Sequence, residues 1–132
     1  MSHPLLVIVD DEEDLLELLA YNFQRRGYEV VSFTRAQPAL EFIEQRRPDM
    51  VLCDWMMPEM DGLTLCQQLK GSLHLADLPF VMFTCRTESS AQRLALAAGV
   101  TDFITKPIGM EALMKRVAEV ITQHHRMRGQ AG

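Results

Sequence analysis

Five short apolar segments alternate with stretches of helical periodicity along this chain of 132 residues. The segments at residues 5–9, 49–53 and 80–83 are almost wholly apolar, whereas those at 28–33 and 101–105 mix apolar with polar side chains. Short, nearly continuous apolar runs are typical of strands buried on both faces of a parallel sheet. The pattern therefore predicts three central strands and two edge strands.

Amphipathic helices are predicted after each strand, because apolar side chains recur there at intervals of three and four residues. Asp61 is the expected N-cap of the third helix, and Ser89 with Gln92 forms a capping-box pattern before the fourth. The last helix loses its periodicity after about Gln123. The predicted helices cover approximately residues 15–26, 37–46, 62–70, 91–98 and 110–123.

The regular alternation of strand and helix predicts an α/β fold, a doubly wound five-stranded parallel sheet flanked by five helices. Placing the continuously apolar strands at the centre gives the strand order 2-1-3-4-5, with right-handed crossovers. Residues 1–123 are expected to form one domain, and residues 124–132 a frayed C-terminal tail or linker.

Composition narrows the classes of function that fit. A formal net charge of -5 disfavours direct nucleic-acid binding, which depends on neutralising phosphates. No apolar run approaches the roughly 20 residues that cross a bilayer, and the first residues lack the basic region of a signal peptide. We therefore expect a cytoplasmic protein without a membrane partner. Three cysteines without metal-type spacing are expected to be small buried residues in a reducing compartment: Cys53, Cys66 and Cys85.

Charged and hydroxyl side chains follow four of the predicted strands. Asp10 and Asp11 come after the first strand, Asp54 after the third, Thr84 after the fourth and Lys106 after the fifth. Taken singly, each has an ordinary explanation, since acidic residues favour helix N-termini and an Asp after a strand is often a turn residue. Because the carboxyl ends of parallel strands meet at one edge of a sheet, however, we expect these side chains to lie together.

Three carboxylates in one crevice repel each other unless a cation or a proton relieves the repulsion. Mg²⁺ is commonly held by one or two carboxylates, a carbonyl, waters and a phosphate. A nucleophilic carboxylate beside a cation, a lysine and a hydroxyl suits phosphoryl transfer through an aspartyl phosphate. The residues therefore predict Mg²⁺-dependent phosphoryl transfer to Asp54.

With this set of residues the chain resembles a response regulator receiver domain of two-component signalling, across roughly residues 4–122. The resemblance implies the flavodoxin-like fold and phosphorylation of Asp54 by the phosphohistidine of a sensor histidine kinase or a histidine phosphotransfer protein. It implies no enzymatic activity beyond catalysis of the domain's own phosphorylation and dephosphorylation. The matching motifs are Asp10-Asp11, the turn from Asp54 through Pro58 to Asp61-Gly62, Thr84 and Lys106-Pro107.

The same resemblance implies how the metal would be bound. Asp11, Asp54 and the carbonyl of Met56 would be ligands of Mg²⁺, and Asp10 would act largely through water. Lifetime of the phosphoryl group in relatives varies with the residues at Met56 and Arg86. Neither offers a carboxamide or carboxylate to orient an attacking water, so we expect a long-lived phosphoryl group. Cys85 stands where a smaller Ala or Gly is usual, and we expect it to narrow access to the site.

Signal output is also implied by the resemblance. Lys106 would pair with the phosphoryl oxygens, Thr84 would move to hydrogen-bond them, and Phe103 would be the aromatic switch residue. The peptide bond before Pro107 would be cis. The implied output face comprises the fourth helix, fifth strand and fifth helix, which would bind a downstream effector or a second, phosphorylated copy of the chain. The alternative is that Phe103 is an ordinary half-buried aromatic residue of its strand, with no role in switching.

Three other classes of protein share parts of this pattern. A haloacid dehalogenase-type phosphohydrolase needs a second Asp two residues after the nucleophile, where this chain has Met56. A flavodoxin-like nucleotide binder needs a hydroxyl-rich phosphate loop, whereas an acidic run follows the first strand here. A phosphorylation-independent interaction module on a receiver scaffold stays open. The residues also leave open the downstream pathway and whether the receiver is free-standing.

Overall fold

The computed structural model describes the backbone of residues 3–131 and the side chains of residues 3–129. Parallel strands pair in the order β2-β1-β3-β4-β5. This is the predicted strand order, and the predicted α/β fold class is confirmed. The elements follow one another as β1 (Leu5–Val9), α1 (Glu13–Arg25), β2 (Glu29–Phe33), α2 (Ala36–Gln45), β3 (Met50–Cys53), α3 (Gly62–Lys70), the 3-10 turn η1 (Leu73–Leu75), β4 (Phe80–Thr84), α4 (Ser89–Ala97), β5 (Asp102–Thr105) and α5 (Met110–Ala131).

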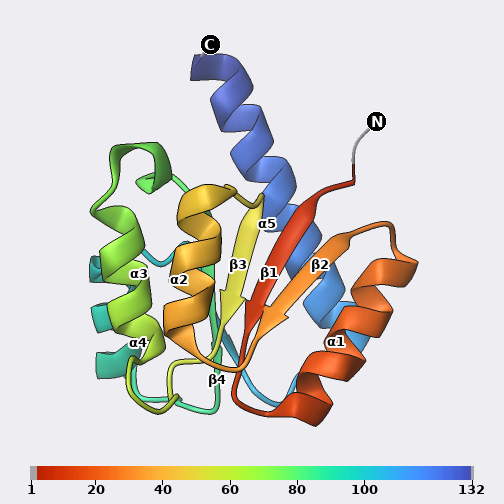
Figure 1. Ribbon diagram of the computed structural model, residues 1–132, viewed down its shortest axis with the longest axis vertical. Coiled ribbons are helices and arrows are strands. Elements are labelled where there is room, and N and C mark those ends of the chain that lie inside the picture. The colour runs from red at the N-terminus through yellow and green to blue at the C-terminus, as the bar shows by residue number, and fades with distance from the viewer. Residues whose placement is uncertain (1–2, 132) are drawn as a thin grey trace.

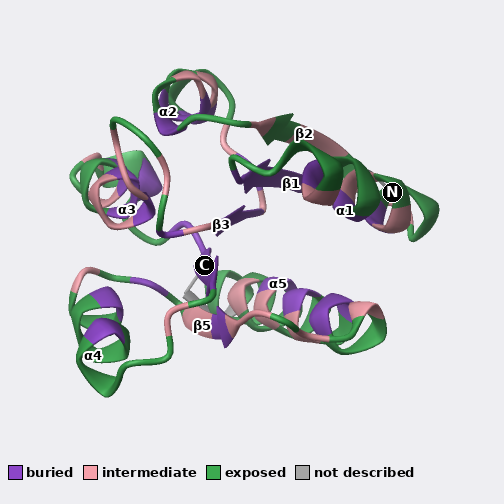
Figure 2. Ribbon diagram, turned by 90° about the horizontal axis from the view of Figure 1, so that it is seen from below, coloured by how far each residue is buried: buried purple, intermediate pink, exposed green. Residues whose placement is uncertain are grey.

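The sheet separates two layers of helices, with α1 and α5 on one face and α2, α3 and α4 on the other (Figures 1 and 2). Successive side chains of β1 point to opposite faces, so Ile8 belongs to the same buried cluster as Phe23 of α1, while Val7 belongs to the cluster that contains Ile43 of α2. Strands β1, β3 and β4 are buried throughout. Strands β2 and β5 are partly exposed, which confirms the prediction of central and edge strands.

The last helix is longer than the sequence pattern predicted. α5 continues to Ala131, so the frayed end expected after Gln123 is wrong as a prediction of backbone structure. Extending an existing helix fixes one residue for each new hydrogen bond, so its last turns need no apolar stripe. His125 near this end contacts the Asp49 carboxylate at 3.0 Å. Despite its length, neither α5 nor any other helix within residues 3–131 has the apolar span that a membrane crossing requires.

Helix starts follow the predictions at α3 but not at α4. The Asp61 side chain accepts a hydrogen bond from the Thr64 N–H at 2.9 Å, which confirms it as the N-cap of α3. Ser89, predicted to cap α4, is instead its first residue, and Glu88 occupies the N-cap position without a side-chain cap hydrogen bond. The Glu88 carboxylate is paired with the guanidinium of Arg86, which removes it from the helix end.

Burial of the cysteines was predicted correctly for Cys53 and Cys66 but wrongly for Cys85, which is exposed. Cys85 follows β4 directly and already belongs to the loop before α4, outside the sheet. Cys85 is exposed because of its place in this loop, although cysteine is usually a buried residue type.

Gly62, the first residue of α3, approaches the chain beside Asp54 very closely. Its N–H donates to the Trp55 carbonyl at 2.9 Å, and a Cβ at this position would lie 2.2 Å from the backbone oxygen of Asp54. Backbone atoms cannot give way as a flexible side chain does.

We therefore predict that Gly62→Ala lowers the free energy of unfolding by on the order of 2 kcal/mol, as overpacking does. Urea denaturation followed by circular dichroism measures the loss. Gly109→Ala is the matched control, because a Cβ there would meet no atom within 4 Å. Equal midpoints for the two variants would contradict the close approach.

Candidate functional site: an acidic crevice at the carboxyl ends of the strands

Asp54 is the first residue after β3, and the surrounding backbone holds it at the edge of the sheet. Its N–H donates to the Val9 carbonyl at 2.9 Å, which extends the pairing with β1 by one residue. Its Oδ1 atom accepts a hydrogen bond from the Trp55 N–H at 2.7 Å. The side chain keeps 13% of its exposure, so it lies within the crevice and still reaches solvent.

Asp10 and Asp11 follow the neighbouring strand β1. The Asp10 N–H donates to the Phe33 carbonyl at 3.0 Å, and its Oδ1 atom accepts from the Glu12 N–H at 2.9 Å. Asp10 is buried, with 2% exposure, whereas Asp11 is exposed. One turn thus supplies a buried and an accessible carboxylate.

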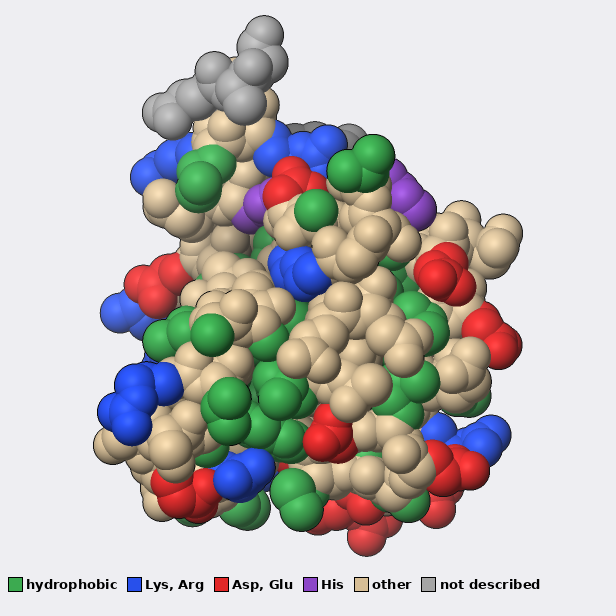
Figure 3. All heavy atoms as spheres, turned by 90° about the vertical axis from the view of Figure 1, so that its left-hand side faces the viewer, with side chains coloured by type: hydrophobic (Ala, Val, Ile, Leu, Met, Phe, Trp, Pro, Cys, Tyr) green, Lys and Arg blue, Asp and Glu red, His purple; other side chains and the backbone are tan. Residues whose placement is uncertain are grey.

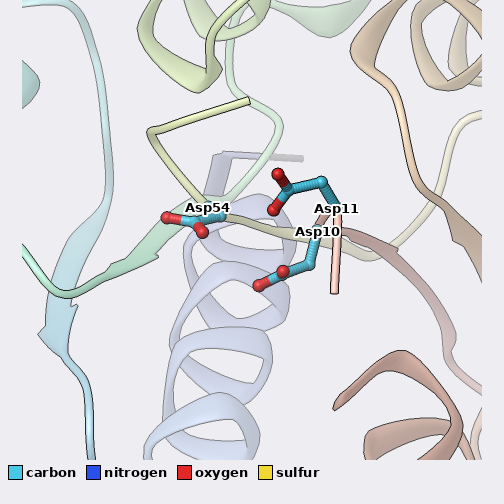
Figure 4. A group of neighbouring side chains, drawn as sticks. All are labelled: Asp10, Asp11 and Asp54. Atoms are coloured by element: carbon cyan, nitrogen blue, oxygen red, sulfur yellow. The ribbon is translucent and has the colours of Figure 1, made fainter. Parts of the chain in front are cut away.

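One carboxylate oxygen from each of Asp10, Asp11 and Asp54 lies within 4.8 Å of the other two. Figure 4 shows these side chains near one another, Asp10 and Asp11 on one segment and Asp54 on another. Acidic side chains also gather along the lower edge of Figure 3, the edge at which the strands end in Figure 1. An oxygen-only set of this geometry fits a hard divalent cation such as Mg²⁺.

Lys106, the residue after β5, provides the positive charge of the crevice. Its Nζ atom lies 2.7 Å from Oδ2 of Asp10 and 3.3 Å from Oδ2 of Asp54. The Nζ atom also lies 5.1 Å from the centre of the Phe83 ring, which favours a cation. The Lys106–Pro107 peptide bond is cis, as predicted.

The protonation of this pair reflects both burial and charge. Burial raises the pKa of Asp10 above its ordinary value of 3.8, and the nearby Asp54 charge adds to the rise, although Lys106 opposes it. Burial alone would lower the pKa of Lys106, but its contacts with Asp10 and Asp54 outweigh burial and raise that pKa. Lys106 therefore stays charged, and its charge compensates only part of the cost of burying the charged Asp10 carboxylate.

Thr84 and Phe103 lie beside the crevice on β4 and β5. Thr84 is 1% exposed, and its Oγ1 atom accepts a long hydrogen bond of 3.4 Å from the Arg86 N–H. Phe103 is half-buried and pairs with Met82 in the sheet register. Its ring meets the Trp55 ring edge-on, with centroids 6.3 Å apart. Both residues lie where the sequence placed them, and their roles as switch residues stay predictions.

The remaining predicted residues lie around the mouth of the crevice. The Met56 side chain is 61% exposed, and Cys85 is exposed as well. Sequence reasoning placed Lys106 and Asp10 at the same edge of the sheet but did not predict their short ion pair, and it missed the stacking of Arg86 on Trp55. The Arg86–Trp55 contact has no sequence signal, because it joins residues on different strand-end loops. The metal-ligand role of the Met56 carbonyl stays a prediction.

Comparison with known proteins identifies the family. Residues 6–118 match the family model described as response regulator receiver domain, and the chain therefore belongs to that family. It is 36% identical over 118 residues to the phosphate regulon transcriptional regulatory protein PhoB of Rhizobium meliloti, covering 89% of this chain and 52% of that protein. It is 34% identical over 116 residues to the alkaline phosphatase synthesis transcriptional regulatory protein PhoP of Bacillus subtilis, covering 88% and 48%. The chain spans about half the length of these relatives.

Solved structures agree with this assignment. The signal receiver domain of a signal transduction histidine kinase from Syntrophus aciditrophicus superposes with a TM-score of 0.83 at 31% identity, over 91% of each chain. The BeF3-activated N-terminal receiver domain of Klebsiella pneumoniae RstA gives 0.82 at 31% identity, over 89% of this chain and 97% of that one. The flavodoxin-like receiver fold predicted from the sequence is confirmed.

We expect the buried charge of Asp10 to affect the stability of the fold. Because the pKa of Asp10 is raised in the folded state, its stabilising contribution is complete below pH 3.8 and is lost as the pH rises through the raised value. At pH 7 the charged form opposes folding. We predict that Asp10→Asn raises the free energy of unfolding at pH 7, because it removes a charge that burial and the nearby Asp54 disfavour, and that the gain shrinks on acidification.

Urea denaturation at several pH values without added metal measures this gain. Asp14→Asn on the exposed first turn of α1 is the matched control, and it should produce no gain. The raised pKa of Asp10 would be contradicted if Asp10→Asn gave no gain in stability at pH 7, or a gain that is equally large at low pH.

Proposed function

We propose that Asp54 accepts a phosphoryl group from the phosphohistidine of a sensor histidine kinase or a histidine phosphotransfer protein. The observation that carries the proposal is the geometry of the crevice: three carboxylates lie within 4.8 Å, and Lys106 contacts two of them. This arrangement concentrates negative charge around a nucleophile and offers a cation to a phosphoryl group. Membership of the receiver family supports the same conclusion.

In the proposed transfer an Asp54 carboxylate oxygen forms a bond to phosphorus while the phosphorus–nitrogen bond of phosphohistidine breaks. The electron pair of that bond stays on the imidazole, and the product is an acyl phosphate. The Trp55 N–H holds Oδ1 of Asp54, which leaves Oδ2 facing Lys106. Lys106 can then exchange its contact with Asp54 for one with a phosphoryl oxygen.

Asp10, Asp11 and Asp54 fit Mg²⁺ by the chemistry of their donor atoms, with the Met56 carbonyl as a further proposed ligand. When bound, the ion neutralises charge on the transferring group. Asp10 and Lys106 already contact each other at 2.7 Å, so this chain's own residues hold the crevice together and keep the lysine oriented.

The proposed output is a change in the face formed by α4, β5 and α5. Thr84 would move to hydrogen-bond the phosphoryl group, and Phe103 would turn in response. Moving a population from 1:99 to 99:1 takes about 5.5 kcal/mol of differential stabilisation, and charge-assisted hydrogen bonds from Lys106 and Thr84 supply part of it. The receivers of transcriptional regulators are similar in sequence, so the proposed partners include a downstream effector and a second phosphorylated copy, in the cytoplasm.

A phosphorylation-independent interaction module on the same scaffold is the second candidate function. Leu94 and Leu96 on α4 favour it, because each is an exposed apolar side chain that a partner could contact without a phosphate. The intact acidic crevice favours the phosphoacceptor function over the interaction module.

The proposed phosphorylation is tested by intact mass after incubation with Mg²⁺ and a small acyl-phosphate donor. We predict one added phosphoryl group in the wild type, none in Asp54→Asn and none when EDTA removes the metal. Glu59→Gln, which removes a nearby exposed carboxylate, is the matched control and should be phosphorylated normally. If neither the small donor nor a phosphohistidine protein modifies the wild type, the interaction module becomes the better function.

The lifetime of the phosphoryl group tests the roles of Met56 and Arg86. The thioether of Met56 and the guanidinium of Arg86, which is paired with Glu88 at 3.0 Å, offer no carboxamide or carboxylate to orient a hydrolytic water. We predict slow loss of the phosphoryl group in Mg²⁺ buffer and a several-fold faster loss in Met56→Asn, measured by the decay of the phosphorylated mass. Fast loss that Met56→Asn leaves unchanged would refute this.

A further inference from the structure

Trp55 connects the phosphoacceptor to two elements that the proposed switch would move. Its backbone N–H donates to Asp54 at 2.7 Å, and its ring meets the Phe103 ring edge-on at 6.3 Å. The guanidinium carbon of Arg86 lies 4.4 Å from the centre of the same ring. Trp55 is only 3% exposed and belongs to the buried apolar cluster between the sheet and helices α2, α3 and α4.

Arg86 is held in place by contacts along its whole length. Its backbone N–H donates to Thr84 Oγ1 at 3.4 Å, its Nε atom contacts the Glu88 carboxylate at 3.0 Å, and its guanidinium covers the Trp55 ring. A cation over an aromatic face is attracted by the ring quadrupole. The loop between β4 and α4 is therefore tied to Thr84 at one end and to Trp55 by its side chain.

These contacts conflict with the movement that the proposed function assigns to Thr84. A threonine hydroxyl that turns toward a phosphoryl group on Asp54 leaves the Arg86 N–H without its acceptor, and the loop must shift with it. We propose that the stacking of Arg86 on Trp55 holds the β4–α4 loop in its unphosphorylated position and so opposes activation. Arg86 is then a positioning residue for Thr84; the inference rests on the proposed phosphorylation of Asp54.

A direct contact between Arg86 and the phosphoryl group is the competing interpretation. It is disfavoured because the guanidinium already has Glu88 and the Trp55 ring as partners, and because Lys106 supplies a cation 3.3 Å from Asp54. The two interpretations predict opposite effects when the arginine is removed. Loss of a phosphate ligand weakens anion binding, whereas loss of a restraint on the resting loop strengthens it.

The experiment measures binding of beryllium fluoride, a stable mimic of a phosphoryl group, in the presence of Mg²⁺. Trp55 is the only tryptophan, so its fluorescence reports the binding directly. We predict that Arg86→Gln binds the anion about fivefold more tightly, which corresponds to about 1 kcal/mol and to a partly exposed cation–π contact. Arg93→Gln, which removes the same charge from an exposed position on α4, should not bind it more tightly.

Weaker or unchanged binding in Arg86→Gln would overturn the inference. Acrylamide quenching of Trp55 without the anion is a second readout, because removal of the covering guanidinium should increase quenching in Arg86→Gln and not in Arg93→Gln. Unchanged quenching would also overturn it. If no variant and not even the wild type binds beryllium fluoride, the proposed function itself fails, a result distinct from failure of the restraint alone.

Discussion

The rest of the site depends on the electrostatic balance between Lys106 and the carboxylates of Asp10, Asp11 and Asp54. Like charges this close repel, and burial of Asp10 adds the cost of desolvating its charge, which is the main cause of its raised pKa. Lys106 relieves only part of it, with its short contact to Asp10 and its longer one to Asp54. The crevice therefore has a deficit of positive charge, which suits a divalent cation.

The fold sustains this balance because the charged residues follow three strands of one parallel sheet. β1, β3 and β5 deliver Asp10, Asp54 and Lys106 to the same edge, and the backbone pairing of β1 with β3 continues one residue beyond the strands to fix Asp54. Gly62 allows α3 to begin directly against the Asp54 backbone. The two apolar cores on either side of the sheet stabilise the fold and so offset the repulsion between the carboxylates in the crevice.

In the proposed function the same balance makes the domain a switch. A phosphoryl group on Asp54 gives Lys106 and Thr84 a new partner, and both side chains then leave contacts that they make in the resting state. Trp55 lies between that change and Phe103 on β5, with Arg86 covering its ring. A local change of charge can thus reach the α4–β5–α5 face through packed side chains.

The sequence by itself determined the strand order, the central and edge strands and the identity of the residues at the rim. Apolar runs report burial on both faces, and residues at parallel strand ends must share one edge of the sheet. Local sequence patterns predicted the ends of helices less well. The capping pattern at Ser89 misplaced the start of α4, and the loss of periodicity after Gln123 misplaced the end of α5. Only the tertiary structure decided the pairing of Lys106 with Asp10 and the stacking of Arg86 on Trp55. Those contacts join loops far apart in the chain, and their geometry depends on how the loops pack rather than on any pattern along the sequence.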